Sequence, residues 1–90
     1  SPLVRGMTAS LLGRSGVPDP VPALVEALKL ERDPYAFRQM YEALNELTFA
    51  YIAVIPPKTM DFATMERIQS SWTTWYGANR FAYQKFEDPN

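Results

Sequence analysis

The sequence predicts an all-α fold, an αα-superhelix of stacked helical hairpins with four helices in about two hairpins. The first observation is an internal repeat. Ser1-Pro2 and Asp33-Pro34 each open a similar amphipathic stretch, and an offset of 32 residues superimposes Leu12 on Leu44. The second observation is that apolar residues recur at helical spacing after each of these start signals. A repeat of a few tens of residues is typical of a solenoid, in which each unit buries its apolar face against its neighbour.

Residues 1–32 are predicted to form the first hairpin, as one repeat unit. Ser1 is a suitable N-cap for its first helix, and Pro2 suits the first turn because the missing N–H is not needed there. Gly13 and Gly16 are expected to end this helix. The stripe expected to face the core consists of Leu3 or Val4, Met7, Leu11 and Leu12.

The second helix follows the start signal Asp19-Pro20 and has the clearest amphipathic pattern in the chain. Glu26 and Lys29 lie on the side opposite its apolar face. That apolar face consists of Val21, Leu24, Val25 and Leu28. We therefore expect Leu28 in the core and Lys29 in water.

Residues 33–79 are predicted to form a terminal unit, as a second antiparallel hairpin. Its first helix opens at Asp33-Pro34, and residues 49–60 follow as an irregular loop, because Pro56-Pro57 prevents a helix from continuing. A loop that contains several Ile, Val and Tyr residues needs packing, so we expect this one to be largely buried. The core stripe of the first helix consists of Ala36, Met40, Leu44 and Leu47, with Tyr51 as a further candidate.

A last helix over residues 61–76, capped by Asp61 or Thr59, is predicted to close the end of the array. Its core stripe consists of Phe62, Met65, Ile68 or Gln69, Trp72, Trp75 and Tyr76. Its solvent-exposed side consists of Thr64, Arg67, Ser71 and Thr74. Residues 80–90 form an aromatic tail. Its Phe81, Tyr83 and Phe86 either fold back on the helices or dock on a partner, and their spacing favours neither outcome.

The segment Val21–Leu28 and the pair Leu12-Gly13 resemble the short bacterial HEAT repeat named after phycobilisome lyases. Ala43–Leu47 is similar to part of a second, weaker unit, and the helix that ends in Trp72–Tyr76 resembles the terminal unit of some bacterial HEAT arrays. The resemblance implies the end of an α-solenoid, a scaffold role and no catalytic machinery. It does not imply the attachment of a bilin pigment.

The composition argues against several classes of function. Nine Lys and Arg against ten Asp and Glu give a net charge of −1, so no basic face indicates nucleic acid. The absence of His and Cys removes the commonest general base and the preferred metal ligands, so no metal, cofactor or catalytic residue is expected. A chain without Cys fits oxidising and reducing compartments equally, so no localisation is predicted. No apolar run reaches the ~18 residues of a membrane-spanning helix.

Three carboxylates lie close together in the sequence, at Glu26, Glu31 and Asp33, but they do not predict an acid–base pair or a cation site. Asp33 is better explained as a helix cap. Glu26 and Glu31 are expected in a solvated mixture of charges, and catalysis would require burial that nothing in the pattern predicts.

The sequence thus predicts a non-catalytic protein–protein interaction scaffold without a small-molecule substrate, either the end of a longer HEAT-repeat protein or a small subunit of an assembly. A start at Ser1 instead of Met favours the fragment. Two alternatives stay open: an accessory or chaperone factor, similar to a lyase, for a pigment or haem protein, and a peripheral membrane subunit that uses Phe49–Ile55 and the aromatic tail. The residues expected to bind a partner are Pro22, Glu26 and Lys29 on the second helix and Phe81, Tyr83 and Phe86 in the tail.

Overall fold

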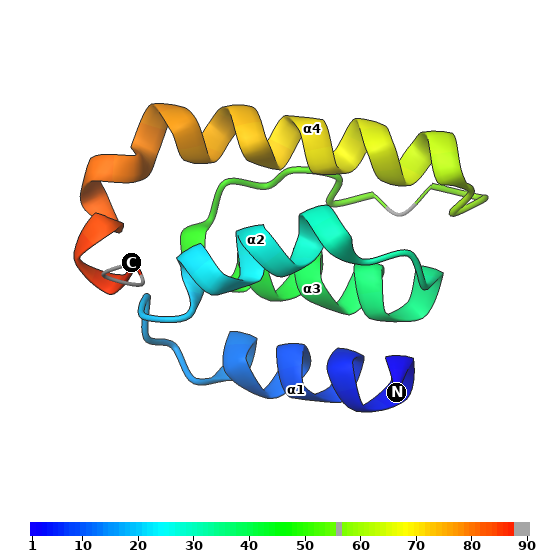
Figure 1. The fold of residues 1–90 in the computed structure, drawn as a ribbon, viewed down its shortest axis with the longest axis horizontal. Helices are drawn as coiled ribbons and strands as arrows, with labels where there is room; N and C mark the ends of the chain where they lie inside the picture. Colours follow the sequence, from blue (N-terminus) through cyan, green and yellow to red (C-terminus); the bar gives the residue numbers. More distant parts are fainter. Residues whose placement is uncertain (56, 88–90) are drawn as a thin grey trace.

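The computed structural model describes residues 1–55 and 57–87, which contain four α-helices and no strand (Figure 1). The all-α class and the four predicted helices are confirmed. Pro56, in the predicted loop, and the last three residues of the predicted tail, 88–90, lie outside the described part. The elements are α1 (Pro2–Arg14), α2 (Val21–Leu30), α3 (Pro34–Thr48) and α4 (Phe62–Asn79), followed by two short 3-10 turns, η1 (Arg80–Ala82) and η2 (Gln84–Phe86).

Side-chain caps begin three of the helices. Ser1, Asp33 and Asp61 each accept a hydrogen bond from the backbone N–H three residues further on, at 3.5, 3.0 and 2.9 Å respectively. These bonds satisfy N–H groups that have no partner within the helix. α2 instead begins after Pro20 without a side-chain cap, so Asp19 does not cap it.

The directions of the helices follow from their connections (Figure 1). α1 and α2 run in opposite directions, and so do α2 and α3. Residues 49–61 then cross back from the end of α3 to the start of α4, so α3 and α4 run in the same direction. A connection of about twelve residues is long enough to return along a helix of about 22 Å without being fully extended. The second pair therefore differs from the antiparallel hairpin that the sequence predicts, and α4 packs antiparallel to α2.

The core lies where α2, α3 and α4 meet and where α1 lies against α3. Leu28 and Leu44 are 1% and 0% exposed, which confirms their predicted burial. The predicted stripe of α3 is confirmed as well, with Leu47 half-buried at its edge. The largest fully buried side chains are Trp72, Tyr41, Phe37, Leu28, Leu44, Val21 and Val25.

α1 turns its small residues, and not its large ones, toward the rest of the molecule. Gly6, Ala9 and Gly13 are buried. A Cβ atom added at Gly13 would lie 2.8 Å from the Cα atom of Ala43, so the two helices approach more closely than larger residues would allow. Gly13 lies inside the helix, which ends at Arg14. The predicted core stripe is wrong, because its members are exposed: Leu3, Val4, Met7, Leu11 and Leu12.

The segment after α3 is packed on one side only, so the prediction of a largely buried loop is half right. Ala50, Ile52 and Ala53 pack against the core, and Asn45 fixes the backbone of Ile52. The exposed apolar residues of this segment are Phe49, Tyr51, Val54 and Ile55. Tyr51 is therefore not part of the α3 stripe, since the helix ends at Thr48.

α4 continues through Gly77 and ends at Asn79, beyond the predicted end at residue 76. Phe62, predicted in the core, is exposed, and the guanidinium carbon of Arg32 lies 5.2 Å from the centre of its ring. Thr64, predicted on the solvent-exposed side of this helix, is buried. In the predicted aromatic cap, Trp72 is fully buried, whereas Trp75 and Tyr76 are half-buried.

Candidate protein-binding surfaces

Of the α2 residues that were expected to meet a partner, Glu26 is exposed, Lys29 is half-buried and Pro22 is buried. Pro22 is buried, so its expected exposure is wrong. Lys29 Nζ and Glu26 Oε1 form an ion pair at 3.0 Å. The tail explains the burial of Pro22, because it folds back over the start of α2. Pro22 and Glu26 line a hollow together with Ala23, Tyr76, Arg80, Phe86 and Glu87.

Two of the three aromatic residues of the tail are half-buried, and the third is exposed. The ring of Tyr83 lies 5.9 Å from Trp75 and 6.3 Å from Tyr76, centre to centre, and Tyr83 is half-buried. Phe86 is half-buried beside α2. Phe81 is 82% exposed. Tyr83 and Phe86 thus fold back on the helices, as one of the two predicted outcomes had it. Of the three aromatic residues, Phe81 is the one whose ring is exposed.

Glu87 fastens this tail to α4. The hydroxyl of Tyr76 donates to Glu87 Oε2 at 2.7 Å, and Arg80 donates to the same carboxylate from Nε at 3.0 Å and from Nη2 at 3.1 Å. Bonds from Arg80 and Tyr76 lower the pKa of Glu87. Burial, and then the bond to Glu87, raise the pKa of the Tyr76 hydroxyl. The tail is therefore closed by charge-assisted hydrogen bonds.

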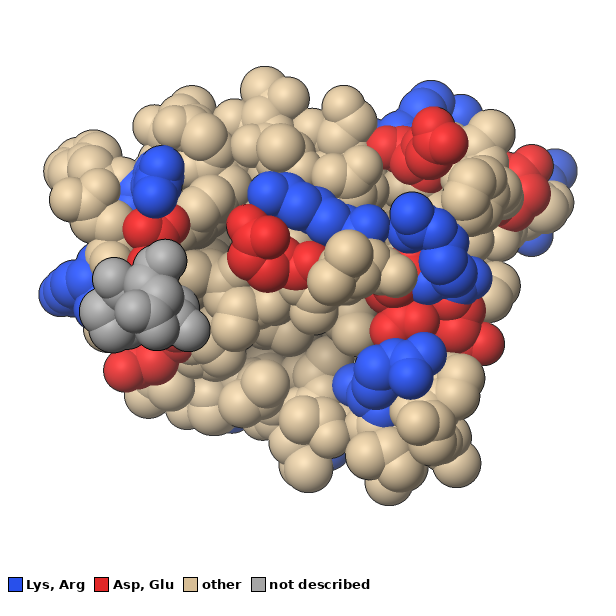
Figure 2. Space-filling view, in the orientation of Figure 1, with Lys and Arg blue, Asp and Glu red and all other residues tan. Residues whose placement is uncertain are grey.

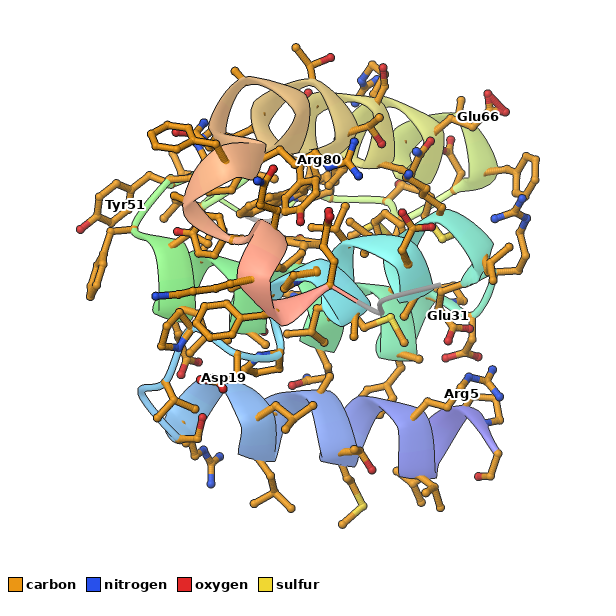
Figure 3. The ribbon with its side chains drawn as sticks, turned by 60° about the vertical axis from the view of Figure 1, so that its left-hand side comes forward. Arg5, Asp19, Glu31, Tyr51, Glu66 and Arg80 are labelled. Atoms are coloured by element: carbon orange, nitrogen blue, oxygen red, sulfur yellow. The ribbon has the colours of Figure 1, made fainter. Side chains whose placement is uncertain are left out.

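Glu31 is another residue whose environment differs from the prediction. It is only 5% exposed and not part of a solvated mixture of charges. Its carboxylate points toward Arg5 at one end of the molecule (Figure 3). Its pKa is lowered chiefly by the hydrogen bond from Arg5. This ion pair, in which Glu31 is buried and Arg5 is about half exposed, fastens one helix to another.

The side of α1 that points away from α3 is an exposed apolar surface. We call it the outer face of α1, and it consists of Leu3, Val4, Met7 and Leu11, which are 53–65% exposed. A hollow of about 360 Å³ lies at its edge, where Met7 and Leu11 meet Tyr35 and Gln39 of α3. Contiguous apolar patches of this kind usually mark interaction sites.

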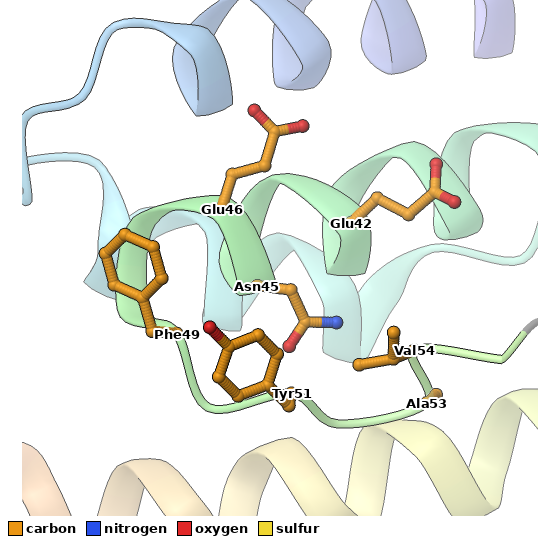
Figure 4. A pocket seen from close by; sticks show the side chains of 7 residues that line it. All are labelled: Glu42, Asn45, Glu46, Phe49, Tyr51, Ala53 and Val54. Carbon is orange, nitrogen blue, oxygen red and sulfur yellow. The ribbon is translucent and has the colours of Figure 1, made fainter.

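A second candidate is a cleft of about 490 Å³ between α3 and the segment that follows it (Figure 4). We call it the aromatic–acidic cleft. The ring centres of Phe49 and Tyr51 are 6.4 Å apart, and these two residues are 68% and 67% exposed. The cleft is lined by Glu42, Asn45 and Glu46 from α3 and by Phe49, Tyr51, Ala53 and Val54.

Asn45 holds the segment that carries the two rings. Its Nδ2 donates to the carbonyl oxygen of Ile52 at 2.6 Å, and the N–H of Ile52 donates to Asn45 Oδ1 at 2.8 Å. The hydroxyl of Thr48 accepts a further bond from the N–H of Ala50 at 3.2 Å. The segment is thus fixed to α3, and its outward-pointing side chains are held in place. The apolar composition of Phe49–Ile55 was visible in the sequence, but the role of Asn45 was not.

Charged side chains of both signs lie next to one another on the face that Figure 2 shows, in keeping with the near-zero net charge. Within residues 1–55 and 57–87, no group of three or more His, Cys, Asp or Glu is placed to hold a metal ion. Over the same residues, no helix is both long enough and apolar enough to cross a membrane. The candidate sites are the outer face of α1 and the aromatic–acidic cleft.

Comparison with family models, with curated proteins and with solved structures gave no match. The resemblance to HEAT repeats therefore still depends on the residues quoted for it and stays a prediction.

Proposed function

We propose that this chain is a non-catalytic protein–protein interaction scaffold in which the outer face of α1 receives a further helical unit, as at the end of a HEAT-like array or in a multi-protein assembly. The internal repeat carries the proposal. At the 32-residue offset, the outer-face residues Leu3, Met7 and Leu11 correspond to Tyr35, Gln39 and Ala43 of α3.

The α3 positions are the ones on which α1 lies. The ring of Tyr35 occupies the space beside Gly6, and Ala43 occupies the space beside Gly13. The equivalent positions of α1 are more than half exposed, although Met7 and Leu11 also line a hollow beside Tyr35 and Gln39. The exposed positions of α1 are thus the repeat equivalents of the α3 positions on which α1 packs. A further helix would pack on α1 as α1 packs on α3. The helix that fits has small residues at the spacing of Gly6, Ala9 and Gly13.

The energetics favour occupation of this face. Burial of a large apolar side chain stabilises an association by roughly 1.5–3 kcal/mol relative to exposure. Four such residues share the outer face, all of them more than half exposed. Their combined burial is large enough to offset part of the entropic cost of association. Stacking of repeat units gains stability in the same way.

Photo-cross-linking in the native cells tests this proposal. A benzophenone amino acid is placed at Leu11 on the outer face and, as a control, at Ser71, which is exposed on α4. We expect cross-links of discrete mass from Leu11 only, and mass spectrometry should map them to a helix with a stripe of small residues, in the same polypeptide or in a partner protein. Equal or absent cross-linking from the two positions would contradict the proposal.

A further inference from the structure

We propose that the aromatic–acidic cleft binds the arginine side chain of a protein partner. This site lies on α3 and the segment after it, and the inference does not rest on the outer face of α1. It rests on three features of the cleft: the backbone conformation of its aromatic residues, the carboxylates of its rim, and the absence of a cation over its rings among the described residues.

The aromatic residues are held in an unfavourable backbone conformation. Phe49 and Tyr51 have φ angles of 58° and 59°, in the left-handed region that residues other than glycine rarely adopt. Hydrogen bonds that Asn45 and Thr48 accept from the backbone of Ile52 and Ala50 hold the segment in this shape. Strain of this kind persists only where the surrounding structure enforces it, and it clusters at binding sites. Its consequence here is that both rings stand in water, side by side, at the mouth of the cleft (Figure 4).

The rim of the cleft is negative. Glu42 and Glu46 lie one turn apart on α3, a spacing at which two like charges repel each other. Arg38 contacts Glu42 at 3.5 Å, but both side chains are more than 40% exposed, and such pairs are weak. Glu46 makes no ion pair with any described residue. A cation bound at the rim would relieve the repulsion between the two carboxylates.

Two other rings of the chain have a cation over them. The guanidinium of Arg32 covers Phe62, and the ammonium of Lys85 lies 5.1 Å from the ring centre of Phe86. Among the described residues, no cation covers Phe49 or Tyr51 in this way. Aromatic faces attract cations. Phe49 and Tyr51 can therefore each bind a cation that another molecule supplies.

Arginine fits these features better than lysine does. Its planar guanidinium stacks on aromatic faces, donates two parallel hydrogen bonds to a carboxylate and is weakly hydrated. A cleft of about 490 Å³ has room for such a side chain together with a neighbouring apolar residue. Val54 and Ala53 line the side of the cleft where that neighbour would lie. The partner is thus a protein segment in which an arginine is flanked by apolar residues.

Titration of the full chain with two peptides tests the inference without any variant. The first probe is acetyl-Gly-Leu-Arg-Leu-Gly-amide, and the second has citrulline, which is neutral and of the same shape, in place of arginine. We expect saturable NMR shifts at the side-chain amide of Asn45 and the backbone of Tyr51 with the arginine peptide, and about tenfold weaker binding of the citrulline peptide. Equal affinities for the two peptides, or shifts elsewhere only, would overturn the proposal.

Tyr51→Gly separates binding from folding. Glycine adopts a positive φ without cost, so this variant should unfold at the same or a higher temperature, yet bind the arginine peptide at least several-fold more weakly. Glu42→Gln combined with Glu46→Gln should weaken the same peptide and reduce its sensitivity to salt. Phe81→Ala, which removes an exposed ring elsewhere, is the matched control and should bind as the natural chain does.

Lipid is the competing ligand for exposed rings, and a vesicle experiment distinguishes it. Glu42 and Glu46 repel an anionic membrane surface, so we expect no co-sedimentation of the full chain with phosphatidylserine vesicles. Co-sedimentation that Tyr51→Gly abolishes and Phe81→Ala preserves would overturn the arginine proposal in favour of a membrane contact. Either result leaves the cross-linking test at Leu11 unaffected.

Discussion

The guanidinium of Arg5 and the carboxylate of Glu31 form a two-point ion pair that fastens the start of α1 to the end of α2 (Figure 3). Nε lies 2.7 Å from Oε1, and Nη2 lies 3.0 Å from Oε2. The backbone N–H groups of Arg32 and Asp33 also donate to Oε2, each at 3.1 Å. A single buried carboxylate thus holds two helices and the turn between α2 and α3.

This ion pair predicts how stability depends on pH. The bond from Arg5 lowers the pKa of Glu31 below its ordinary value of 4.5. A carboxylate with a lowered pKa in the folded state stabilises the fold above its unfolded pKa, and this stability is lost as the pH falls through the folded pKa. Glu31→Gln should lower the free energy of unfolding by about 1–3 kcal/mol at pH 7, and the difference from the natural chain should shrink below pH 4.5.

Urea unfolding followed by circular dichroism between pH 7 and pH 3 measures this difference. Glu66→Gln, at an exposed carboxylate on α4, is the control and should leave the free energy of unfolding nearly unchanged. A Glu31→Gln difference that stays constant down to pH 3 would show that the ion pair does not form.

The close contact of α1 with α3 predicts opposite effects for two glycine substitutions. Gly13→Ala places a methyl group 2.8 Å from the backbone of Ala43, so it should destabilise the fold by about 1–3 kcal/mol. Gly77→Ala meets nothing within 4 Å and lies inside α4, so it should stabilise the fold by about 0.5–1 kcal/mol. Thermal unfolding of both variants checks the signs. If both substitutions raised the unfolding temperature, α1 would not lie this close to α3.

The same contact shows why the sequence predicted α3 correctly and α1 wrongly. Helical spacing identifies an apolar stripe, but it does not reveal whether a neighbour covers that stripe. The stripe of α3 is covered by α2 and by the rest of the hydrophobic core, so Leu44 is buried. The stripe of α1 has no such neighbour among the described residues, so Leu11 is exposed. Small residues such as Gly13 gave no apolar pattern, and their role appears only when Ala43 is placed beside them.

The aromatic–acidic cleft could be foreseen only in part. The composition of Phe49–Ile55 indicated an unusual connection, and its apolar residues predicted burial. Phe49 and Tyr51 instead have left-handed backbone and are exposed, which no propensity of Phe or Tyr predicts. Asn45 sets this shape from within α3 through its bonds to Ile52, and a polar residue inside a helix resembles any other exposed position in the sequence.

The position of α2 against α3 predicts a contrast between two neighbouring residues. Leu28 is 1% exposed, whereas the side chain of Lys29 is 36% exposed and pairs with Glu26. Leu28→Ala should lower the free energy of unfolding by roughly 2–5 kcal/mol, as should Leu44→Ala. Lys29→Ala should change it by less than about 0.5 kcal/mol. Denaturant midpoints measure the contrast, and equal midpoints for Leu28→Ala and Lys29→Ala would place the wrong face of α2 in the core.

The two tryptophans of α4 should differ in both stability and fluorescence. Their rings meet edge to face, 5.6 Å apart, but Trp72 is fully buried and Trp75 is only half-buried. Trp72→Ala should therefore cost roughly 3–5 kcal/mol, and Trp75→Ala clearly less. Trp72→Phe keeps most of the volume and removes an indole N–H that has no acceptor among the described residues, so its cost should stay below about 1.5 kcal/mol.

Single-tryptophan variants make the same contrast visible without unfolding the protein. Trp75→Phe leaves Trp72 as the fluorophore, and its emission should be blue-shifted and resistant to iodide because the ring is shielded from water. Trp72→Phe leaves Trp75, whose emission should be red-shifted and more readily quenched. The opposite order of quenching would mean that α4 presents its other face to α2, and that Trp75 closes the core. In that case Trp72 would stand at the surface as part of a recognition platform, and its truncation would weaken partner binding without a loss of stability.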